Sequence, residues 1–208
     1  MRIDRITVGP FQANAWLLGR TDRPDTILID PGGEPDRIAE RIEAGGRRLA
    51  AILNTHGHLD HIGAVEALRE RFHAPYYLHP ADRPVAEAAP EHAALFGIEP
   101  PRVPSEGRPL RHGERLDIAG VEIAVIHLPG HTPGGTAFLV RGHLFAGDTL
   151  FRGSIGRTDL PGGDGEALLR SIRERLLILP GDTVVHCGHG PDTTIQEERN
   201  GNPFLAGF

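Results

Sequence analysis

Short apolar runs separated by glycine and proline set the pattern of this 208-residue chain. Runs rich in β-branched and aromatic residues predict strands, and apolar residues repeated every three to four positions predict helices. The predicted strands are residues 3–8, 15–18, 26–29, 50–53, 76–78, 121–126, 136–140, 144–145 and 184–186. The predicted helices are residues 35–44, 62–72 and 166–177. Strands mixed with helices in both halves of the chain predict an α/β protein.

Residues 84–109 fit neither pattern well. They are rich in proline and carry only short helical pieces, at residues 86–89 and 91–96. We expect this segment to cross the surface of the protein.

Size and charge narrow the class of protein. A chain of this length can form one substantial domain, here residues 1–208, that buries about 70% of its unfolded surface. The net charge of -6, without a basic run, argues against a nucleic-acid partner. No apolar segment approaches the roughly 20 residues of a membrane span. A single cysteine, Cys187, and an N-terminus unlike a signal peptide predict a cytoplasmic protein. The sequence does not determine whether the protein forms a homo-oligomer.

The densest cluster of metal-binding side chains lies in residues 55–61, Thr-His-Gly-His-Leu-Asp-His. His56 and His58 directly follow a predicted strand, and alternate residues of an extended chain point to the same side, so both can bind one metal ion. Asp60 and His61 are expected at the turn from this strand into the next helix, where they can bind a second ion. Asp60 could instead be a helix cap, but burying four such groups without a metal would be costly.

Three further donors each follow a predicted strand and stand among turn residues. His131 follows Leu-Pro-Gly, Asp148 follows Phe-Ala-Gly, and His189 follows Cys-Gly. Taken singly, each is explained as a turn or surface residue. Their order after residues 55–61 indicates a shared metal site.

This order of donors resembles the metallo-β-lactamase-fold hydrolases, in which T-H-x-H-x-D-H precedes a histidine after P-G, then G-D, then G-H. All seven ligand positions are occupied, and the resemblance extends from Asp30, in the turn Asp-Pro-Gly-Gly, to His189. It implies a single-domain, four-layer αββα sandwich with the metals at one edge. In related enzymes a segment like 84–109 lies near the mouth of the site.

Longer segments resemble one branch of that family, glyoxalase II, the hydroxyacylglutathione hydrolases, and specifically a short bacterial glyoxalase II-like group. The matching stretches are residues 147–162, 187–194, 198–199 and 202–204.

The resemblance implies two divalent metal ions, each held by three side chains and joined by a bridging aspartate. The implied ligands are His56, His58 and His131 for one ion, Asp60, His61 and His189 for the other, and Asp148 as the bridge. Asp30 would steady the site from outside the ligand set, with a plain turn residue as the alternative. Zinc is expected first, although these donors also accept iron and manganese.

The expected reaction is hydrolysis of a small acyl thioester such as S-lactoylglutathione. Two cations sharing a water lower its pKa towards about 7, which supplies a metal-bridging hydroxide, and Asp60 would orient it. Residues 190–208 alone follow the last ligand, so we expect the glutathione-binding groups of longer glyoxalase II enzymes to be missing or replaced. Candidate contacts for a substrate carboxylate are Arg152, Arg157 and Arg199.

Two other functions compete with this one. The Gly-Arg-Thr-Asp stretch at residues 156–159 also resembles persulfide dioxygenases, which implies a mononuclear iron enzyme using His56, His131 and Asp148 with O2. The other is a metal-binding scaffold without catalysis, which is disfavoured because no ligand position has been lost.

Overall fold

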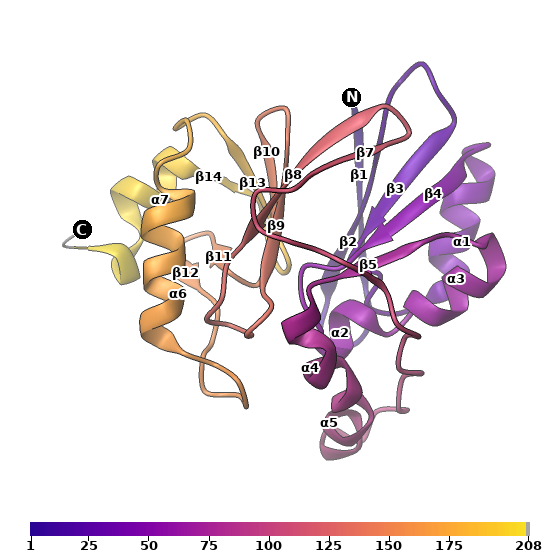
Figure 1. Ribbon diagram of the computed structural model, residues 1–208, viewed down its shortest axis with the longest axis horizontal. Helices are drawn as coiled ribbons and strands as arrows, with labels where there is room; N and C mark the ends of the chain where they lie inside the picture. Colours follow the sequence, from indigo (N-terminus) through magenta and orange to yellow (C-terminus); the bar gives the residue numbers. More distant parts are fainter. Residues whose placement is uncertain (207–208) are drawn as a thin grey trace.

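Two six-stranded β-sheets form the centre of the computed structural model, which describes residues 1–206 (Figure 1). The strands of the first sheet follow chain order: β1 (Arg2–Val8), β2 (Ala13–Gly19), β3 (Asp25–Ile29), β4 (Arg48–Leu53), β5 (Tyr76–Leu78) and β6 (Arg108–Pro109). The second sheet has the order β14 (Thr193–Thr194), β13 (Val184–Cys187), β10 (His143–Gly147), β9 (Thr136–Val140), β8 (Val121–His127) and β7 (Arg115–Ile118). A separate hairpin pairs β11 (Leu150–Phe151) with β12 (Ser154–Ile155).

Helices cover the outer faces of both sheets. The first sheet carries α1 (Pro35–Ala44) and α3 (Val65–Phe72), whereas α6 (Gly165–Ser171) and α7 (Ile195–Gly201) lie beside the second (Figure 1). A third apolar core lies between the sheets and includes side chains of both. The predicted αββα arrangement is therefore confirmed. Within residues 1–206, no helix is long and apolar enough to cross a lipid bilayer.

Coverage on both faces explains the hydrophobic pattern of the inner strands. All seven residues of β2 are buried, because a helix layer covers one face and the other sheet covers the opposite face. By contrast, β8 begins with alternating buried and exposed residues. Glu122 is its exposed position, and it forms an ion pair with Arg115 of the neighbouring strand β7. All the predicted strands therefore lie in the two sheets. A strand covered on both faces is apolar throughout, whereas a strand with one face in solvent alternates buried and exposed residues.

The predicted helix over residues 62–72 is wrong at its start. A separate one-turn helix, α2 (Leu59–Ile62), precedes α3, so Asp60 and His61 lie inside a helical turn and not at a strand-to-helix turn. The break falls at Gly63, where a Cβ atom would lie 2.4 Å from the carbonyl oxygen of Gly32. This close approach places α2 against the Asp-Pro-Gly-Gly turn, and the Ala64 N–H donates to the Pro31 carbonyl oxygen at 2.9 Å instead of continuing the helix.

The other differences concern short elements. Residues 166–177 form α6 followed by a π-helix, Ile172–Leu176. The strands β6, β7, β11, β12 and β14 were not predicted, since four of the five have only two residues and lack a readable period. Helix α7 was also missed. Thr194 caps it by accepting a hydrogen bond from the backbone N–H of Glu197, and Thr followed three residues later by Glu is a known helix-start pattern.

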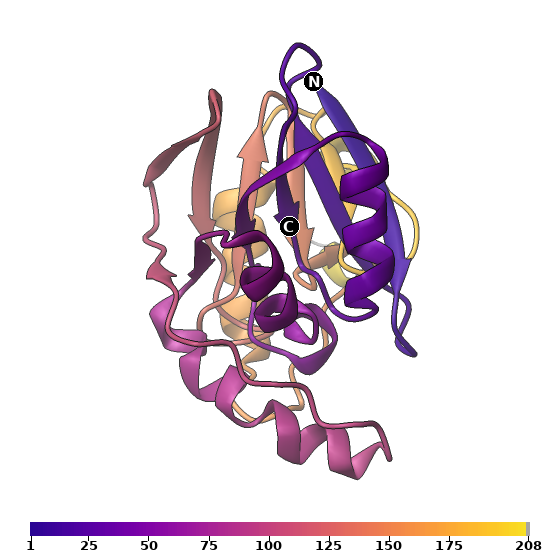
Figure 2. The ribbon, with the colours of Figure 1, turned by 90° about the vertical axis from the view of Figure 1, so that its right-hand side faces the viewer.

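Residues 84–109 form a projection on one side of the molecule (Figure 2). A 3₁₀ turn (Pro80–Asp82) leads into α4 (Arg83–Glu87) and α5 (Ala89–Leu95), after which the chain is irregular until β6. A second 3₁₀ turn, Pro203–Leu205, follows α7. The expected surface excursion is thus confirmed, and its helices border the candidate site described next.

Candidate metal centre

The ends of several strands bring the predicted donors to one edge of the sandwich. Strands β3, β4 and β5 are parallel, and β10 is parallel to β13. Carboxyl ends of parallel strands meet at the same edge of a sheet. The donors follow these ends: Asp30 after β3, residues 55–61 after β4, Asp148 after β10 and His189 after β13. His131 follows β8, which runs in the same direction as β10.

Three buried imidazoles form the first group. His56, His58 and His131 offer nitrogen atoms that lie within 4.8 Å of one another. His58 Nδ1 is 3.0 Å from His131 Nε2, although 73 residues separate them in the chain. The predicted same-side arrangement of His56 and His58 is therefore present, and His131 from the second sheet completes the group.

The second group contains Asp60, His61 and His189, whose donor atoms also lie within 4.8 Å of one another. His189 Nε2 is 3.2 Å from Asp60 Oδ2 and 3.4 Å from His61 Nε2. His61 is fully buried, whereas the side chains of Asp60 and His189 are 20% and 26% exposed. This group is consequently the one more open to solvent.

Asp148 lies between the two groups. Its Oδ2 is 3.8 Å from Nε2 of His131 in the first group and 3.5 Å from Nε2 of His189 in the second. Its Oδ1 is 3.4 Å from Nε2 of His61. A Cβ atom on Gly188 would come within 2.1 Å of this Oδ1, so the position needs glycine. The carboxylate thus faces both groups at once.

Hydrogen bonds fix the orientation of four imidazoles. Nδ1 of His61 contacts Asp30 Oδ2 at 3.0 Å, and Nδ1 of His131 contacts the carbonyl oxygen of Arg157 at 2.7 Å. The remaining anchors are the Thr55 hydroxyl for His56 and the Phe11 carbonyl oxygen for His189. Such anchors set the tautomer and leave Nε2 free for a metal. His58 is the exception, because its Nδ1 points towards His131.

Asp30 forms the support behind these imidazoles. Its carboxylate accepts hydrogen bonds from the Thr55 backbone N–H at 2.7 Å, from the Thr55 hydroxyl at 2.6 Å and from the Asn54 amide at 3.2 Å. It also forms a metal-capable grouping with His56 and His61. Because its oxygens already accept several protein donors, we place Asp30 outside the ligand set.

Two buried polar atoms test whether the site fits a cation. His56 Nε2 and Asp148 Oδ1 are buried without a hydrogen-bond partner within residues 1–206. An unpaired buried nitrogen or carboxylate oxygen costs free energy, and a bound cation removes that cost. Imidazole nitrogens combined with carboxylate oxygens suit divalent zinc, iron and manganese. The residues therefore fit a dinuclear metal site.

The two groups differ in their proton affinity. Burial and neighbouring histidines lower the pKa of His56 well below its usual value, and burial together with His131 lowers the pKa of His58 to about 3. Burial also opposes protonation of His61, but Asp148, Asp60 and Asp30 outweigh it and raise the pKa of His61 well above its usual value. The pKa of His189 is raised too, since a hydrogen bond with Asp60 overcomes burial. In the metal-free protein the second group therefore has the higher proton affinity.

Asp82 is a site residue that the sequence analysis missed. It is fully buried at the end of the 3₁₀ turn after β5. Its Oδ2 accepts from the Gly57 N–H and the Thr132 hydroxyl, both at 2.8 Å, and its Oδ1 accepts from the Gly134 N–H at 2.6 Å. Asp82 thus joins the loop of His56 and His58 to the loop of His131. Its place shortly after a strand is the signal that could have identified it.

A cavity of about 490 Å³ opens next to both groups. Five of the seven predicted ligands line it, namely His58, Asp60, His131, Asp148 and His189. The remaining lining residues are Phe11, Leu59, His92, Leu95, Phe96, Phe151, Arg157 and Leu160. Helix α5 and the residue after it supply three of these, which places the projecting segment at the mouth of the site.

The three predicted arginine contacts have different positions. Arg157 lines the cavity, but its guanidinium makes two hydrogen bonds to Asp159, each 2.7 Å long. Arg152 is exposed in the turn between β11 and β12, outside the lining residues. Arg199 donates to the carbonyl oxygens of Leu177 and Leu179 and so joins α7 to the preceding helix. The structure therefore does not bring Arg152 or Arg199 to the cavity.

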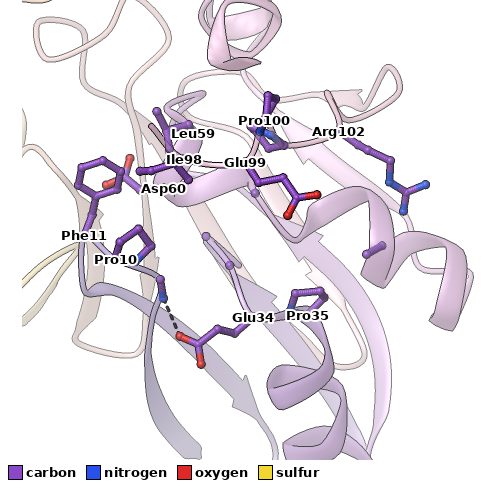
Figure 3. A pocket seen from close by; sticks show the side chains of 16 residues that line it. Pro10, Phe11, Glu34, Pro35, Leu59, Asp60, Ile98, Glu99, Pro100 and Arg102 are labelled. Carbon is purple, nitrogen blue, oxygen red and sulfur yellow. Dashed lines mark hydrogen bonds between the residues drawn. The ribbon is translucent and has the colours of Figure 1, made fainter. Parts of the chain in front are cut away.

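A second cavity of about 420 Å³ adjoins the first at α2 (Figure 3). It shares Phe11, Leu59 and Asp60 with the first cavity. Glu34 lines it and accepts a hydrogen bond from the Gly9 N–H at 2.8 Å, drawn as a dashed line in Figure 3. Asp60 is its only lining residue from the predicted metal ligands, so the first cavity is the candidate substrate site.

Comparison with known proteins matches this geometry. A family model described as the Metallo-beta-lactamase superfamily matches residues 8–189. The "Probable metallo-hydrolase YqgX" of Bacillus subtilis is 42% identical over 212 residues, which cover 100% of this chain and 99% of that protein. The "Hydroxyacylglutathione hydrolase GloC" of Haemophilus influenzae is also 42% identical, over 99% of this chain and 98% of its own length.

Three solved structures agree with the fold. The BLEG-1 B3 metallo-beta-lactamase is 39% identical with a TM-score of 0.91, over 99% of this chain and 100% of its own. TTHA1623 in a di-iron-bound form is 46% identical with a TM-score of 0.90, over 97% and 100%. ETHE1 from Myxococcus xanthus is 27% identical with a TM-score of 0.85, over 100% and 85%.

Proposed function

This chain belongs to the metallo-β-lactamase superfamily and is a metal-dependent hydrolase, and we propose that it cleaves a small acyl thioester such as S-lactoylglutathione. The similarity to the hydroxyacylglutathione hydrolase GloC covers almost the full length of both chains and supports a glyoxalase II-like activity.

The proposed ligand sets follow the two groups of donors. His56, His58 and His131 would hold one divalent ion, and Asp60, His61 and His189 the other. One observation carries the dinuclear assignment: Asp148 lies within 3.8 Å of an imidazole from each group. We propose zinc as the resident metal. Iron is the alternative metal, because the similar protein TTHA1623 was solved in a di-iron-bound form.

Two bound cations would supply a hydroxide nucleophile at neutral pH and polarise the thioester carbonyl. Within the chain, Asp60 belongs to the second group and also lines the cavity, so its carboxylate is placed to orient the nucleophile. Asp148 would fix the spacing of the two groups. A thiolate leaves with little need for a protonating group, so the reaction does not depend on a general acid among the lining residues.

Metal analysis combined with thioester turnover tests this function. We expect purified protein to contain two divalent ions per chain and to hydrolyse S-lactoylglutathione, with the activity lost on chelation and restored by metal. Absence of hydrolysis from protein that holds two ions would contradict the proposed substrate class.

A persulfide dioxygenase is the second candidate, because the Gly-Arg-Thr-Asp stretch at residues 156–159 resembles that group of enzymes. That activity would need one iron held by His56, His131 and Asp148. It leaves unexplained why Asp60, His61 and His189 assemble as closely as the first group. One iron per chain, with oxygen uptake on glutathione persulfide and no thioester cleavage, would establish this alternative.

Metal binding should depend on pH more strongly at the second group. His56 and His58, with lowered pKa values, are neutral at pH 7 and have no proton to release. His61 and His189, with raised pKa values, must lose protons before they bind a cation. Lowering the pH from about 8 to about 6 should therefore empty the second group first, with up to tenfold weaker binding per pH unit for each displaced proton.

Calorimetry can follow this difference with zinc and metal-free protein. Titrations in buffers of different ionisation enthalpy count the protons released at each binding step. Equal proton release at both steps would contradict the assignment of the two groups.

A further inference from the structure

The cavity beside the two donor groups has an apolar rim. Phe11, Phe96 and Phe151 line it together with leucines at positions 95 and 160. The rings of Phe11 and Phe96 meet edge to face with centroids 5.3 Å apart, which closes the wall between the β1–β2 loop and the end of α5. Leu95 is nevertheless 81% exposed and Phe96 58% exposed. Large apolar side chains left in water at a cavity mouth commonly mark a binding surface.

Charged groups able to bind a carboxylate are scarce in the same cavity. Apart from the metal-binding donors, its ionisable lining residues are His92 and Arg157. The Arg157 guanidinium already forms a two-pronged ion pair with Asp159. A thiol carrier that bears carboxylates or phosphates would have to give up water for this apolar wall, which is unfavourable. An uncharged acyl group faces no such cost.

The cavity also has the volume for more than a lactoyl group. Its roughly 490 Å³ lies within the range of about 300–1,000 Å³ typical of drug-sized ligands. Asp60, Asp148 and His189 line the same cavity as the apolar residues, so a carbonyl placed against these donors would direct one arm of the thioester along the apolar wall.

We propose that this cavity binds the acyl arm of the thioester and selects an extended aliphatic or aromatic acyl group, with Leu95 and Phe96 as specificity-determining residues. The charged carrier then extends towards solvent. This inference rests on the proposed thioesterase function and extends its substrates from the small lactoyl group to longer aliphatic or aromatic acyl groups.

A series of thioesters with one neutral carrier, N-acetylcysteamine, tests the inference. The acyl groups are acetyl, lactoyl, butyryl, hexanoyl and phenylacetyl, and the measured quantity is kcat/KM for the metal-loaded enzyme. We expect kcat/KM to rise by about two- to fourfold per added methylene, as for burial of that group. Leu95→Ser and Phe96→Ser should flatten this rise with acyl length, whereas Leu95→Met should retain it.

Ile178→Ser is the matched control, because Ile178 is 73% exposed and lies outside the cavity lining. It should keep the full dependence on acyl length. Circular dichroism and metal content would show that each variant is folded and loaded.

Several outcomes would overturn the inference. Hydrolysis of lactoyl thioesters without any rise along the series would refute the acyl pocket while leaving the proposed function intact. Cleavage of S-lactoylglutathione but of no member of the series would likewise refute the acyl pocket alone, whereas failure to cleave S-lactoylglutathione as well would refute both. If Leu95→Ser instead dissociates a dimer and the acyl dependence persists, the apolar rim is a subunit contact and the inference is wrong.

Discussion

Replacing Asp148 with alanine is expected to abolish hydrolysis and to lower the metal content of the protein. Asp148 is the carboxylate that faces both donor groups, so its loss would remove the proposed shared ligand of both ions at the same time. We expect kcat/KM for S-lactoylglutathione to fall by at least about 10³-fold, which corresponds to about 4 kcal/mol of transition-state stabilisation. Steady-state kinetics and metal analysis of the same preparation measure both effects.

Two further variants make this result specific. Asp148→Asn keeps the size of the side chain and one carbonyl oxygen, so it should retain more metal than the alanine variant but little activity. Asp182→Ala removes an exposed aspartate in the turn before β13 and should behave like the native protein. Near-native turnover with two ions per chain in Asp148→Ala would refute the bridging role.

Replacing Asp82 with alanine should have the second largest effect, although Asp82 is not among the proposed ligands. The change leaves the N–H groups of Gly57 and Gly134 and the Thr132 hydroxyl without their acceptor. Each unsatisfied buried donor costs about 1–3 kcal/mol, so we expect the free energy of unfolding to fall by about 3 kcal/mol or more. Thermal denaturation should show a decrease in Tm of about 6–12 °C.

The same variant should also weaken one metal position selectively. Asp82 contacts the loops of His56, His58 and His131 but none of the second group, so metal affinity at the first group should drop by about 10–100-fold. Titration with zinc would then show one tight and one weak ion per chain, and excess zinc should restore part of the activity.

A helix-cap variant separates this effect from a general loss of stability. Thr194→Ala removes the cap of α7 and should cost about 1 kcal/mol without changing zinc affinity. Asp82→Asn, which keeps the size of the side chain, should be intermediate in both stability and affinity. Unchanged zinc affinity in a folded Asp82→Ala or Asp82→Asn protein would show that Asp82 serves the fold alone.

The sequence predicts which of these side chains come together, because their positions follow from local rules. Period-two spacing places His56 and His58 on one side, and His131, Asp148 and His189 follow strands that end at one edge. The contacts of Asp82 follow no such rule. Its hydrogen-bond partners lie 25 to 52 residues away along the chain, and only the docking of three loops brings them within 2.8 Å of the Asp82 carboxylate.

Two of the arginines predicted to contact a substrate carboxylate are instead bound to other groups of the protein. Arg157 is held by Asp159, two residues further along, and this pairing was available in the sequence. Arg199 meets carbonyl oxygens that become accessible only where the preceding helix ends. Which nitrogen of each imidazole faces the centre likewise depends on long-range acceptors, such as the Phe11 carbonyl for His189.

Each donor group draws on both sheets of the sandwich. His56 and His58 from the first sheet meet His131 from the second, and His61 meets His189 in the same way. An ion bound in either group would therefore cross-link the two halves of the chain at their open edge. Each ligand set is complete only when the two halves are docked, so bound ions should slow the separation of a chain cut between β6 and β7.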